Sequence, residues 1–353
     1  MWINSVKKVL TSKQLEISCN TVIIMKILIF EYSTIIFDNN LIFEGYNMLK
    51  SILTDLDKLD EFEVHYLINE NQKIENLKNC KSIILNENLI KWLEKNSSFY
   101  DYCLFIAPED NYIQYNITKL LEKNNITILG SNSNASHICS SKHETYNTIP
   151  KEIKKIPSIK KDINLCDYNE LKNIFKEEEM ILKPDNKTAS NFIYKVNDEK
   201  SFNKIIKEYK ENNIHEILIQ KFIDGESVST SIICNKNYIN CISLNSQIIE
   251  NKKNRFKYQG CETPIEHPLK NKIYEISEKI IKSINGLKGF VGIDYIIKDN
   301  EIYFVEINSR ITTPFIVLDE ITDINLTKYL IDISLGKKGS YIQLTKNGEF
   351  YNK

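Results

Sequence analysis

Between Met25 and about Asn134, short apolar runs alternate with longer stretches that have the periodicity of amphipathic helices. Such alternation is typical of strand–helix units whose parallel strands form one sheet. The pattern therefore predicts a Rossmann-like α/β domain over residues 25–133. The expected strands are Ile27–Phe30, Phe62–Ile68, Ser82–Leu85, Tyr102–Ala107 and Ile126–Leu129, with helices around Glu44–Leu56 and Tyr112–Leu121.

The carboxyl ends of these strands supply the first candidate binding residues. No G-x-G-x-x-G motif is present, so the sequence does not indicate a dinucleotide. Ligands of doubly wound sheets nevertheless bind beyond the carboxyl ends of the strands, which places Glu31, Tyr32 and the turn at 108–110 at a candidate rim. We expect Glu31 and Tyr32 to help bind a substrate, although Tyr32 fits a packing role equally well.

The chain continues well beyond one domain, because 353 residues exceed the usual size of a single hydrophobic core. Turn and cap residues at 131–134 predict a boundary and the start of a helix that carries Lys142. Residues 134–216 are then expected to form a small β-rich lobe, and residues 217–345 a larger lobe. Residues 1–24 are expected to be a flexible arm or an over-long start.

The strands and helices expected in the two lobes follow from their apolar spacing. The larger lobe shows alternating segments typical of an antiparallel sheet. The expected elements are strands at Met180–Pro184, Phe192–Val196, Ile217–Ile223, Ser227–Cys234 and Tyr238–Leu244, a helix at Ser201–Tyr209 and a helix with Ile273, Ile276, Ile280 and Ile284 on one stripe.

A β-hairpin late in the chain carries the clearest chemical signal. Glu306 and Asn308 are two residues apart on its second strand and therefore leave the same face. A three-residue loop at 299–301 would set Asp294 opposite Glu306. Two carboxylates and an amide oxygen among apolar residues are costly to bury unless a cation such as Mg²⁺ neutralises them and bridges substrate phosphates. The alternative is an ordinary strand whose polar face meets solvent.

Two further segments indicate a nucleotide. Lys183 ends a buried strand just before Pro184, where its ammonium is expected to meet an anion such as phosphate. The alternative is a strand-end lysine whose amine reaches water. From Gln220 to Glu226 a strand passes through a glycine turn into the next strand, and such an edge can offer backbone donors and acceptors to a purine.

Together with Lys142, the order and spacing of these segments resemble an ATP-grasp domain over roughly residues 130–320. The resemblance implies a two-lobed α+β fold behind the Rossmann-like domain, with ATP and a divalent cation, Mg²⁺ or Mn²⁺, as cofactors. It also implies site residues. These are Lys142 and Lys183 for the phosphates, Gln220, Lys221, Phe222 and Ile223 for the adenine, Glu226 for the ribose, and Asp294, Glu306 and Asn308 for the metal.

One segment departs from the family pattern. The loop at 185–191 lacks the glycines that usually let this backbone approach phosphate, which puts ATP affinity or loop closure in doubt.

A closer resemblance is to the archaeal tyramine–glutamate ligases of methanofuran synthesis. It rests on residues 29–32 (Ile-Phe-Glu-Tyr) and on the segments 43–49, 258–268 and 306–313. This resemblance implies an enzyme that joins the γ-carboxylate of L-glutamate to the amine of tyramine through an acyl-phosphate. Ser309 and Ile311 stand where prolines are expected, a departure that leaves the exact substrate open.

Arginine is confined to two positions, Arg255 and Arg310, in a chain whose default cation is lysine. An arginine in such a chain points to a place that needs the planar guanidinium group. We expect Arg310 to hold the acyl-phosphate or the substrate carboxylate and, with Lys183, to be catalytic. Arg255 lies in a Lys/Asn-rich connection that could form a lid, and is a candidate substrate contact. Surface pairing with a carboxylate is the alternative for both arginines.

A formal net charge of −1 gives no overall field that would attract nucleic acid or an anionic membrane. No stretch reaches the length of a membrane span, and the eight scattered cysteines form no C-x-x-C pair, which fits reduced thiols. The sequence thus predicts a cytoplasmic protein that acts on small molecules, without nucleic-acid or membrane partners. It leaves a homodimer open.

Two alternatives to the tyramine–glutamate ligase stay open at this point. One is another ATP-grasp ligase, which joins amino acids or peptides or adds glutamate to a cofactor. The other is a regulatory protein that binds nucleotide without turnover, an idea raised by the glycine-poor loop. The complete set of metal-ligand candidates argues against the second alternative.

Overall fold

The computed structural model describes residues 24–185 and 192–352. Its N-terminal unit is a five-stranded parallel sheet with the order β3-β2-β1-β4-β5, which confirms the predicted α/β unit. The central strand is buried on both faces, which explains its unbroken apolar run. The strands are β1 (Met25–Glu31), β2 (Phe62–Ile68), β3 (Cys80–Ile84), β4 (Tyr102–Ile106) and β5 (Thr127–Ile128).

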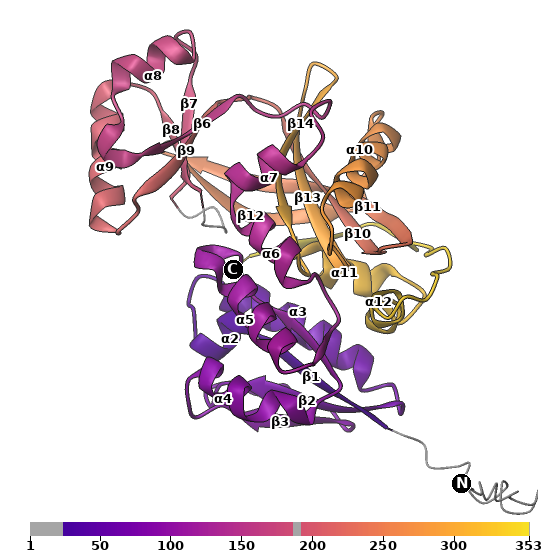
Figure 1. Cartoon of the computed structure of the whole chain (residues 1–353). Helices are drawn as coiled ribbons and strands as arrows, with labels where there is room; N and C mark the ends of the chain where they lie inside the picture. The colour runs from indigo at the N-terminus through magenta and orange to yellow at the C-terminus, as the bar shows by residue number, and fades with distance from the viewer. Residues whose placement is uncertain (1–23, 186–191, 353) are drawn as a thin grey trace, which may run out of the picture.

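Helices cover this sheet, which forms the indigo and violet part of Figure 1. Helix α3 packs its apolar face, which includes Leu49, Ile52 and Leu53, into the same core as β1 and β2. The helices are α2 (Tyr32–Ile36), α3 (Ile42–Leu56), α4 (Leu89–Asn96) and α5 (Ile113–Lys123), with short 3₁₀ turns at η1 (Ser97–Phe99) and η2 (Asp110–Tyr112).

Two short helices follow where the sequence predicted one. The expected helix carrying Lys142 is broken into α6 (Ser133–Ser140) and α7 (Lys142–Thr148). Ser141 between them is extended, and its hydroxyl accepts the backbone N–H of Glu144 as a helix cap. The single-helix prediction was therefore wrong, because a serine that can cap starts a second helix with Lys142 as its first residue.

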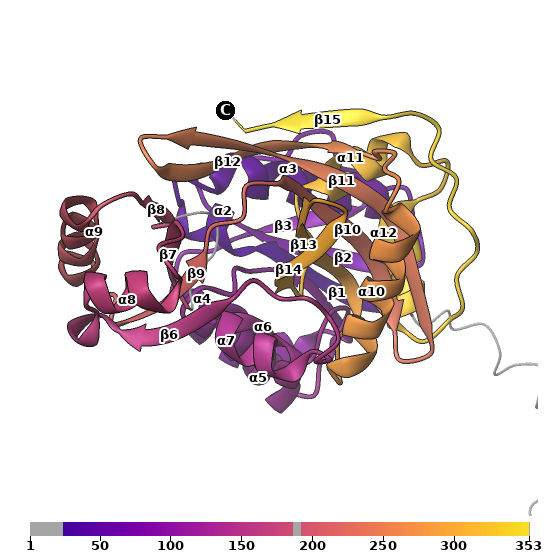
Figure 2. The same ribbon diagram turned by 90° about the horizontal axis from the view of Figure 1, so that it is seen from above.

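The remaining strands form a ten-stranded sheet with the order β14-β13-β10-β11-β12-β8-β7-β9-β6, and β15 pairs with β12. Its small-lobe part contains β6 (Ser158–Asp162), β7 (Met180–Pro184), β8 (Tyr194–Val196) and β9 (Glu216–Lys221), with η3 (Ile163–Leu165), α8 (Tyr168–Ile174) and α9 (Glu199–Glu211). Seen from above in Figure 2, this part stands apart from the larger lobe and is joined to it through β8 and β12.

The larger lobe is an antiparallel sheet, as predicted. Figure 2 shows its last strand, β15, running along β12. Its elements are β10 (Glu226–Asn235), β11 (Tyr238–Lys252), β12 (Arg255–Thr263), β13 (Gly289–Lys298), β14 (Glu301–Asn308), β15 (Gly348–Tyr351), α10 (Lys270–Ser283), α11 (Pro314–Ile321) and α12 (Leu326–Ser334).

Strand membership differs from the sequence prediction at one place. The segment 217–223 was expected in the larger sheet, yet β9 pairs with β6 and β7 of the small lobe. The domain limits 25–133, 134–216 and 217–345 stay a prediction, and residues 1–23 lie outside the described part of the chain.

The β13–β14 hairpin has the predicted pairing of Asp294 with Glu306, but it reaches that pairing by another route. The loop is two residues, Asp299 and Asn300, both with positive φ, and Lys298 pairs with Glu301. The predicted three-residue loop was therefore wrong. A β-bulge next to Asp294 restores the register, because it adds one residue to β14.

No helix in the described residues combines the length and apolar character needed to cross a bilayer. The seven described cysteines are free thiols.

Candidate functional site

A cavity of about 1140 Å³ gathers residues from all three predicted domains. The N-terminal unit contributes the ends of β1 and β4 and the start of α3. The small lobe contributes β7 and the β9–β10 connection, and the larger lobe contributes β11 to β14. Among the predicted site residues, those that line the cavity are Glu31, Lys183, Gln220, Lys221, Phe222, Ile223, Arg255, Asp294, Glu306, Asn308 and Arg310.

Asp294 and Glu306 face each other across the β13–β14 hairpin inside this cavity. Burial and then the neighbouring charge of Glu306 raise the pKa of Asp294 to about 7. Burial also pushes the pKa of Glu306 upward, but Lys142 and Lys183 together more than offset it, so the pKa of Glu306 lies below its usual value. In this pair, the lysines stabilise the negative charge of Glu306, whereas Asp294 is a carboxyl group that a bound cation would stabilise in its charged form.

Asn308 completes this group from the same strand as Glu306. Its Nδ2 donates to Asp294 Oδ2 over 3.4 Å. Rotation of the amide exchanges its nitrogen and oxygen, so Asn308 can also present an oxygen to a cation. Two carboxylates and an amide are ligands that fit a hard divalent ion whose remaining positions are filled by water or phosphate oxygen. Within residues 24–185 and 192–352 no cluster of three or more His, Cys, Asp or Glu residues suits a metal ion.

Lys142 and Lys183 stand beside the acidic pair. The Lys142 ammonium lies 3.3 Å from Glu306, and its side chain is 6% exposed. Burial lowers the pKa of Lys183 to about 8, opposed by Glu306 and reinforced by Lys142. Two buried ammonium groups this close repel each other, so an anion between them would be strongly stabilised.

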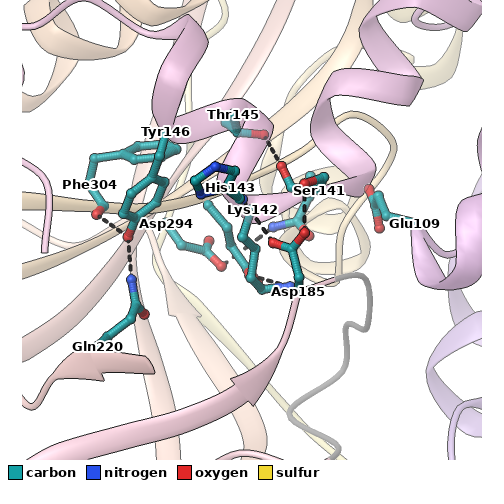
Figure 3. A network of polar contacts seen from close by, with 12 residues as sticks. Glu109, Ser141, Lys142, His143, Thr145, Tyr146, Asp185, Gln220, Asp294 and Phe304 are labelled. Atoms are coloured by element: carbon teal, nitrogen blue, oxygen red, sulfur yellow. Dashed lines mark hydrogen bonds and ion pairs between the residues drawn. The ribbon is translucent and has the colours of Figure 1, made fainter. Parts of the chain in front are cut away.

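Asp185 connects the two lysine-bearing segments (Figure 3). It follows Lys183 by two residues, and its carboxylate accepts the Ser141 hydroxyl at 2.8 Å and the His143 N–H at 2.9 Å. Lys160 lies 3.2 Å from the same carboxylate, and the backbone N–H of Lys142 donates to the Asp185 carbonyl. Asp185 thus fixes the start of α7 against the end of β7. The predicted glycine-poor loop continues through residues 186–191, outside the described part of the chain.

The β9–β10 connection forms another wall. The Gln220 side chain is buried, and its Nε2 donates to the Tyr146 hydroxyl at 2.8 Å, which in turn donates to the Phe304 carbonyl (Figure 3). Lys221 is 2.7 Å from Glu178. The side chains of Gln220 and Lys221 are therefore engaged by protein, which leaves Phe222 and Ile223 to give this wall its apolar surface.

Arg310 is anchored by Glu109, a residue of the N-terminal unit. The Nε of Arg310 donates to Glu109 Oε2 at 3.0 Å, while the backbone N–H of Ser309 donates to Glu109 Oε1 at 3.1 Å. Gln114 holds the same segment through the Ser309 carbonyl and hydroxyl. One of the guanidinium nitrogens, Nη1, also donates to the Ile311 carbonyl. These contacts fix the guanidinium group of Arg310, which lines the cavity.

The other predicted site residues have separate positions. Lys142, Tyr32 and Glu226 are absent from the described lining of the cavity. Tyr32 packs against the N-terminal core, and Glu226 lies 3.5 Å from His267. Arg255 does line the cavity, but it begins strand β12 after a two-residue turn and places its guanidinium over the Tyr194 ring. The connection at Arg255 is a tight turn of the paired β11–β12 hairpin, and the lid there stays a prediction.

Sequence reasoning missed Asp185, Tyr146 and the anchoring role of Glu109. Glu109 was placed at the rim by the strand-end rule, but its partner is two hundred residues away in the chain. Asp185 carried a weak signal, since it directly follows the Lys183-Pro184 pair. Tyr146 carried no such signal, because its role depends on which strands pack against α7.

Comparison with known proteins gives a consistent result. The profile of the ATP-grasp domain matches residues 139–314. The chain is 34% identical to a tyramine–L-glutamate ligase of Methanocaldococcus fervens, over 81% of this chain and 87% of that protein.

Solved structures share the fold. A putative ATP-grasp superfamily protein from Archaeoglobus fulgidus superposes with a TM-score of 0.68 at 23% identity, covering 92% of this chain and 91% of that one. The biotin carboxylase domain of a Hydrogenobacter thermophilus 2-oxoglutarate carboxylase, solved with MgADP and bicarbonate, gives a TM-score of 0.71 at 16% identity, covering 92% and 73% of the two chains.

Proposed function

The chain belongs to the ATP-grasp family and is an ATP-dependent ligase that forms a carbon–nitrogen bond, and from this premise we propose that it joins L-glutamate to tyramine. The observation that supports ligase chemistry most directly is the convergence of Lys142 and Lys183 on the acidic pair Asp294 and Glu306. Such a group of charges is unstable alone and becomes complementary once a metal–triphosphate completes it.

The nucleotide would lie between the lobes. Lys142 and Lys183 would contact its phosphates, and Gln220 to Ile223 would border the adenine, with Glu226 near the ribose. Support comes from the lysines' position beside Glu306 and from the apolar wall at Phe222 and Ile223. Glu226 has the weakest support, because it turns to His267.

ATP-grasp ligases use ATP with a divalent metal. Asp294, Glu306 and Asn308 would hold this ion, which when bound neutralises phosphate charge. We propose Mg²⁺, since all three side chains offer hard oxygen ligands, and expect Mn²⁺ to substitute.

The chemical steps follow from the positions of the side chains. A substrate carboxylate attacks the γ-phosphorus of ATP and forms an acyl-phosphate and ADP, with Lys183 balancing the charge of the transferred group. Arg310 would hold the acyl-phosphate through its cavity-facing edge. A neutral amine then attacks the acyl carbon, the carbon–oxygen bond to phosphate breaks, and the amide forms. Glu109 keeps Arg310 in place throughout.

The substrates are inferred from the relative in Methanocaldococcus fervens, whose name gives tyramine and L-glutamate. We assign the γ-carboxylate of glutamate as the reacting group, with γ-glutamyltyramine for methanofuran synthesis as the product. Another amino acid or amine partner would use the same phosphate chemistry. A cytoplasmic location and a homodimer stay predictions.

The test is release of ADP by the purified chain with Mg·ATP and a panel of amino acids and amines. We expect release only when a carboxylate and an amine are both present, and most with L-glutamate and tyramine. The Lys183→Met variant should lose this release, whereas Lys91→Met, a change at an exposed lysine of α4, should retain it. Nucleotide binding without ADP release from any pair would instead favour a regulatory protein.

A further inference from the structure

One carboxylate of the cavity differs from the others in its surroundings. Asp294 and Glu306 form the metal–phosphate group, Glu208 accepts the Tyr194 hydroxyl, and Glu250 accepts the side-chain amide of Gln259. Glu31 is buried, and both of its oxygens accept backbone N–H groups, those of Ser33 and Thr34. Each of these side chains has a hydrogen-bond partner or a proposed role in the site. Two more carboxylates line the cavity: Asp224, which is exposed, and Glu44, in the first turn of α3, which is half-buried and lies near Arg310.

Glu44 is half-buried and lines the cavity on the side of Arg310. Burial lowers the pKa of Arg310, but the charges of Glu109 and then Glu44 raise it above its usual value, so Glu44 and Arg310 lie within electrostatic reach. No ion pair joins Glu44 to a lysine, arginine or histidine among the described residues. A carboxylate near the expected acyl-phosphate position is thus without a cation of its own.

Two neutral donors fix the direction of this carboxylate. The Thr313 hydroxyl donates to Oε1, and Asn352 Nδ2 donates to Oε2 over 3.5 Å. A carboxylate offers about four lone-pair positions, so each oxygen keeps capacity for another donor. Thr313 directly precedes α11, and Asn352 directly follows β15, so the larger lobe and the C-terminal strand together orient this residue of the N-terminal unit.

Several apolar side chains share the cavity with Glu44. Phe43, Met48, Ile106 and Pro314 line the same cavity. Phe43 is held by stacking on Phe350, with ring centroids 5.8 Å apart. A carboxylate at the edge of an apolar wall suits a ligand with an ammonium at one end and an aromatic or aliphatic body at the other.

We propose that Glu44 binds the ammonium group of the amine acceptor and selects primary arylalkyl amines over uncharged analogues. The name of the acceptor, tyramine, rests on the proposed function, whereas the preference for an ammonium rests on Glu44 and its surroundings. Arg310 and Glu44 then have separate roles: the guanidinium holds the acyl-phosphate, and the carboxylate brings the ammonium next to it. The Glu44 carboxylate accepts the proton that the ammonium loses, and the resulting neutral amine attacks the acyl carbon as phosphate leaves.

The test compares tyramine with 4-ethylphenol, which has the same ring and ethyl group but no ammonium. Calorimetric binding is measured with Mg²⁺, a non-hydrolysable ATP analogue and L-glutamate present. We expect wild type to prefer tyramine roughly 10- to 100-fold, the range of a hydrogen bond to a charged group. The Glu44→Gln variant should lose most of that preference, and Glu44→Asp should keep part of it.

Controls separate this binding role from folding and from the donor substrate. The amide oxygen introduced by Glu44→Gln can still accept from Thr313, so the melting temperature should change little. The exposed Glu94→Gln change on α4 should leave the preference intact. Glutamate affinity should stay within about twofold, the precision of such a comparison.

Three results would overturn the assignment of Glu44. The first is wild-type binding that does not distinguish the two ligands or is undetectable. The second is a Glu44→Gln variant that keeps the wild-type preference. The third is weakened binding of glutamate but not tyramine, which would place the donor's ammonium at Glu44. Failure of the proposed ligase activity would show separately, as absence of glutamate-dependent ADP release by wild type with either tyramine or hydroxylamine, an uncharged nucleophile that does not need Glu44.

Discussion

Replacing Glu109 with glutamine tests the anchoring of Arg310. The Glu109 side chain is 1% exposed and that of Arg310 is 15% exposed, so solvent cannot compensate for a lost partner. Burial raises the pKa of Glu109 above its usual value, and the charge of Arg310 only partly offsets that effect. Glutamine keeps the size of the side chain while it removes the charge and one acceptor.

The size of the effect follows from the two hydrogen bonds. Glu109 accepts Arg310 Nε–H with one oxygen and Ser309 N–H with the other. Glutamine can accept only one of them and turns its own NH₂ group toward the other donor. The loss of one charge-assisted bond, about 1.5–3 kcal/mol, and one unpaired buried donor, about 1–3 kcal/mol, gives roughly 2.5–6 kcal/mol. This agrees with the usual cost of removing one member of a buried ion pair.

The assay is urea unfolding, with the shift in midpoint converted by a shared slope. The matched control is Glu278→Gln, which breaks an exposed pair with Lys282 and should cause no measurable change. We also expect kcat to fall roughly tenfold or more, because a misplaced guanidinium no longer meets the acyl-phosphate. The KM for ATP should hold within about twofold, since the described hydrogen bonds of Glu109 go to Arg310 and Ser309. A loss below about 1 kcal/mol, together with unchanged kcat, would refute the anchoring argument.

The remaining predictions concern three places in the site. Gly45→Ala should destabilise the chain by about 1–3 kcal/mol in thermal unfolding, because an added Cβ would collide with the Glu31 carboxyl group. Burial raises the pKa of Glu31 from 4.5 to about 7. The contribution of Glu31 to the free energy of unfolding should therefore be complete below about pH 4.5 and should fall by about 3 kcal/mol as pH rises through 7. A Glu31→Gln variant whose stability depends on pH in the same way as that of wild type would contradict this prediction. Calorimetry should show weak Mg²⁺ binding until nucleotide supplies further oxygen ligands. Asp294→Asn should raise the Mg²⁺ concentration needed for half-maximal activity. Tight Mg²⁺ binding to the nucleotide-free chain would argue against the metal site. Asp185→Asn should raise the KM for ATP roughly tenfold. The substitution removes the charge that pairs with Lys160 and one of the two oxygens that accept hydrogen bonds from Ser141 and His143 at the start of α7. An unchanged KM would show that other contacts hold α7 in place.

Much of the candidate site could be predicted from local sequence. The alternation of residues along β14 fixed which face Glu306 and Asn308 share, because side chains of a strand alternate strictly. The pairing of Asp294 with Glu306 was also predicted, but only because two errors cancelled. A two-residue turn shifted the register, and a bulge shifted it back. Bulges leave little trace in a single sequence, because they depend on how neighbouring strands twist.

The sequence by itself determined the classes of element and the chemistry they carry: a parallel α/β unit, an antiparallel lobe, and a set of lysine, carboxylate and amide groups suited to metal-bound phosphate. These depend on periodicity and on side-chain type, which are local properties. Tertiary structure alone decided which distant segments contact one another. Examples are Glu109 with Arg310, Asp185 with α7, and Thr313 and Asn352 with Glu44. The reason is that these contacts join residues far apart in the chain, whose approach is set by the packing of whole sheets and helices rather than by any local spacing.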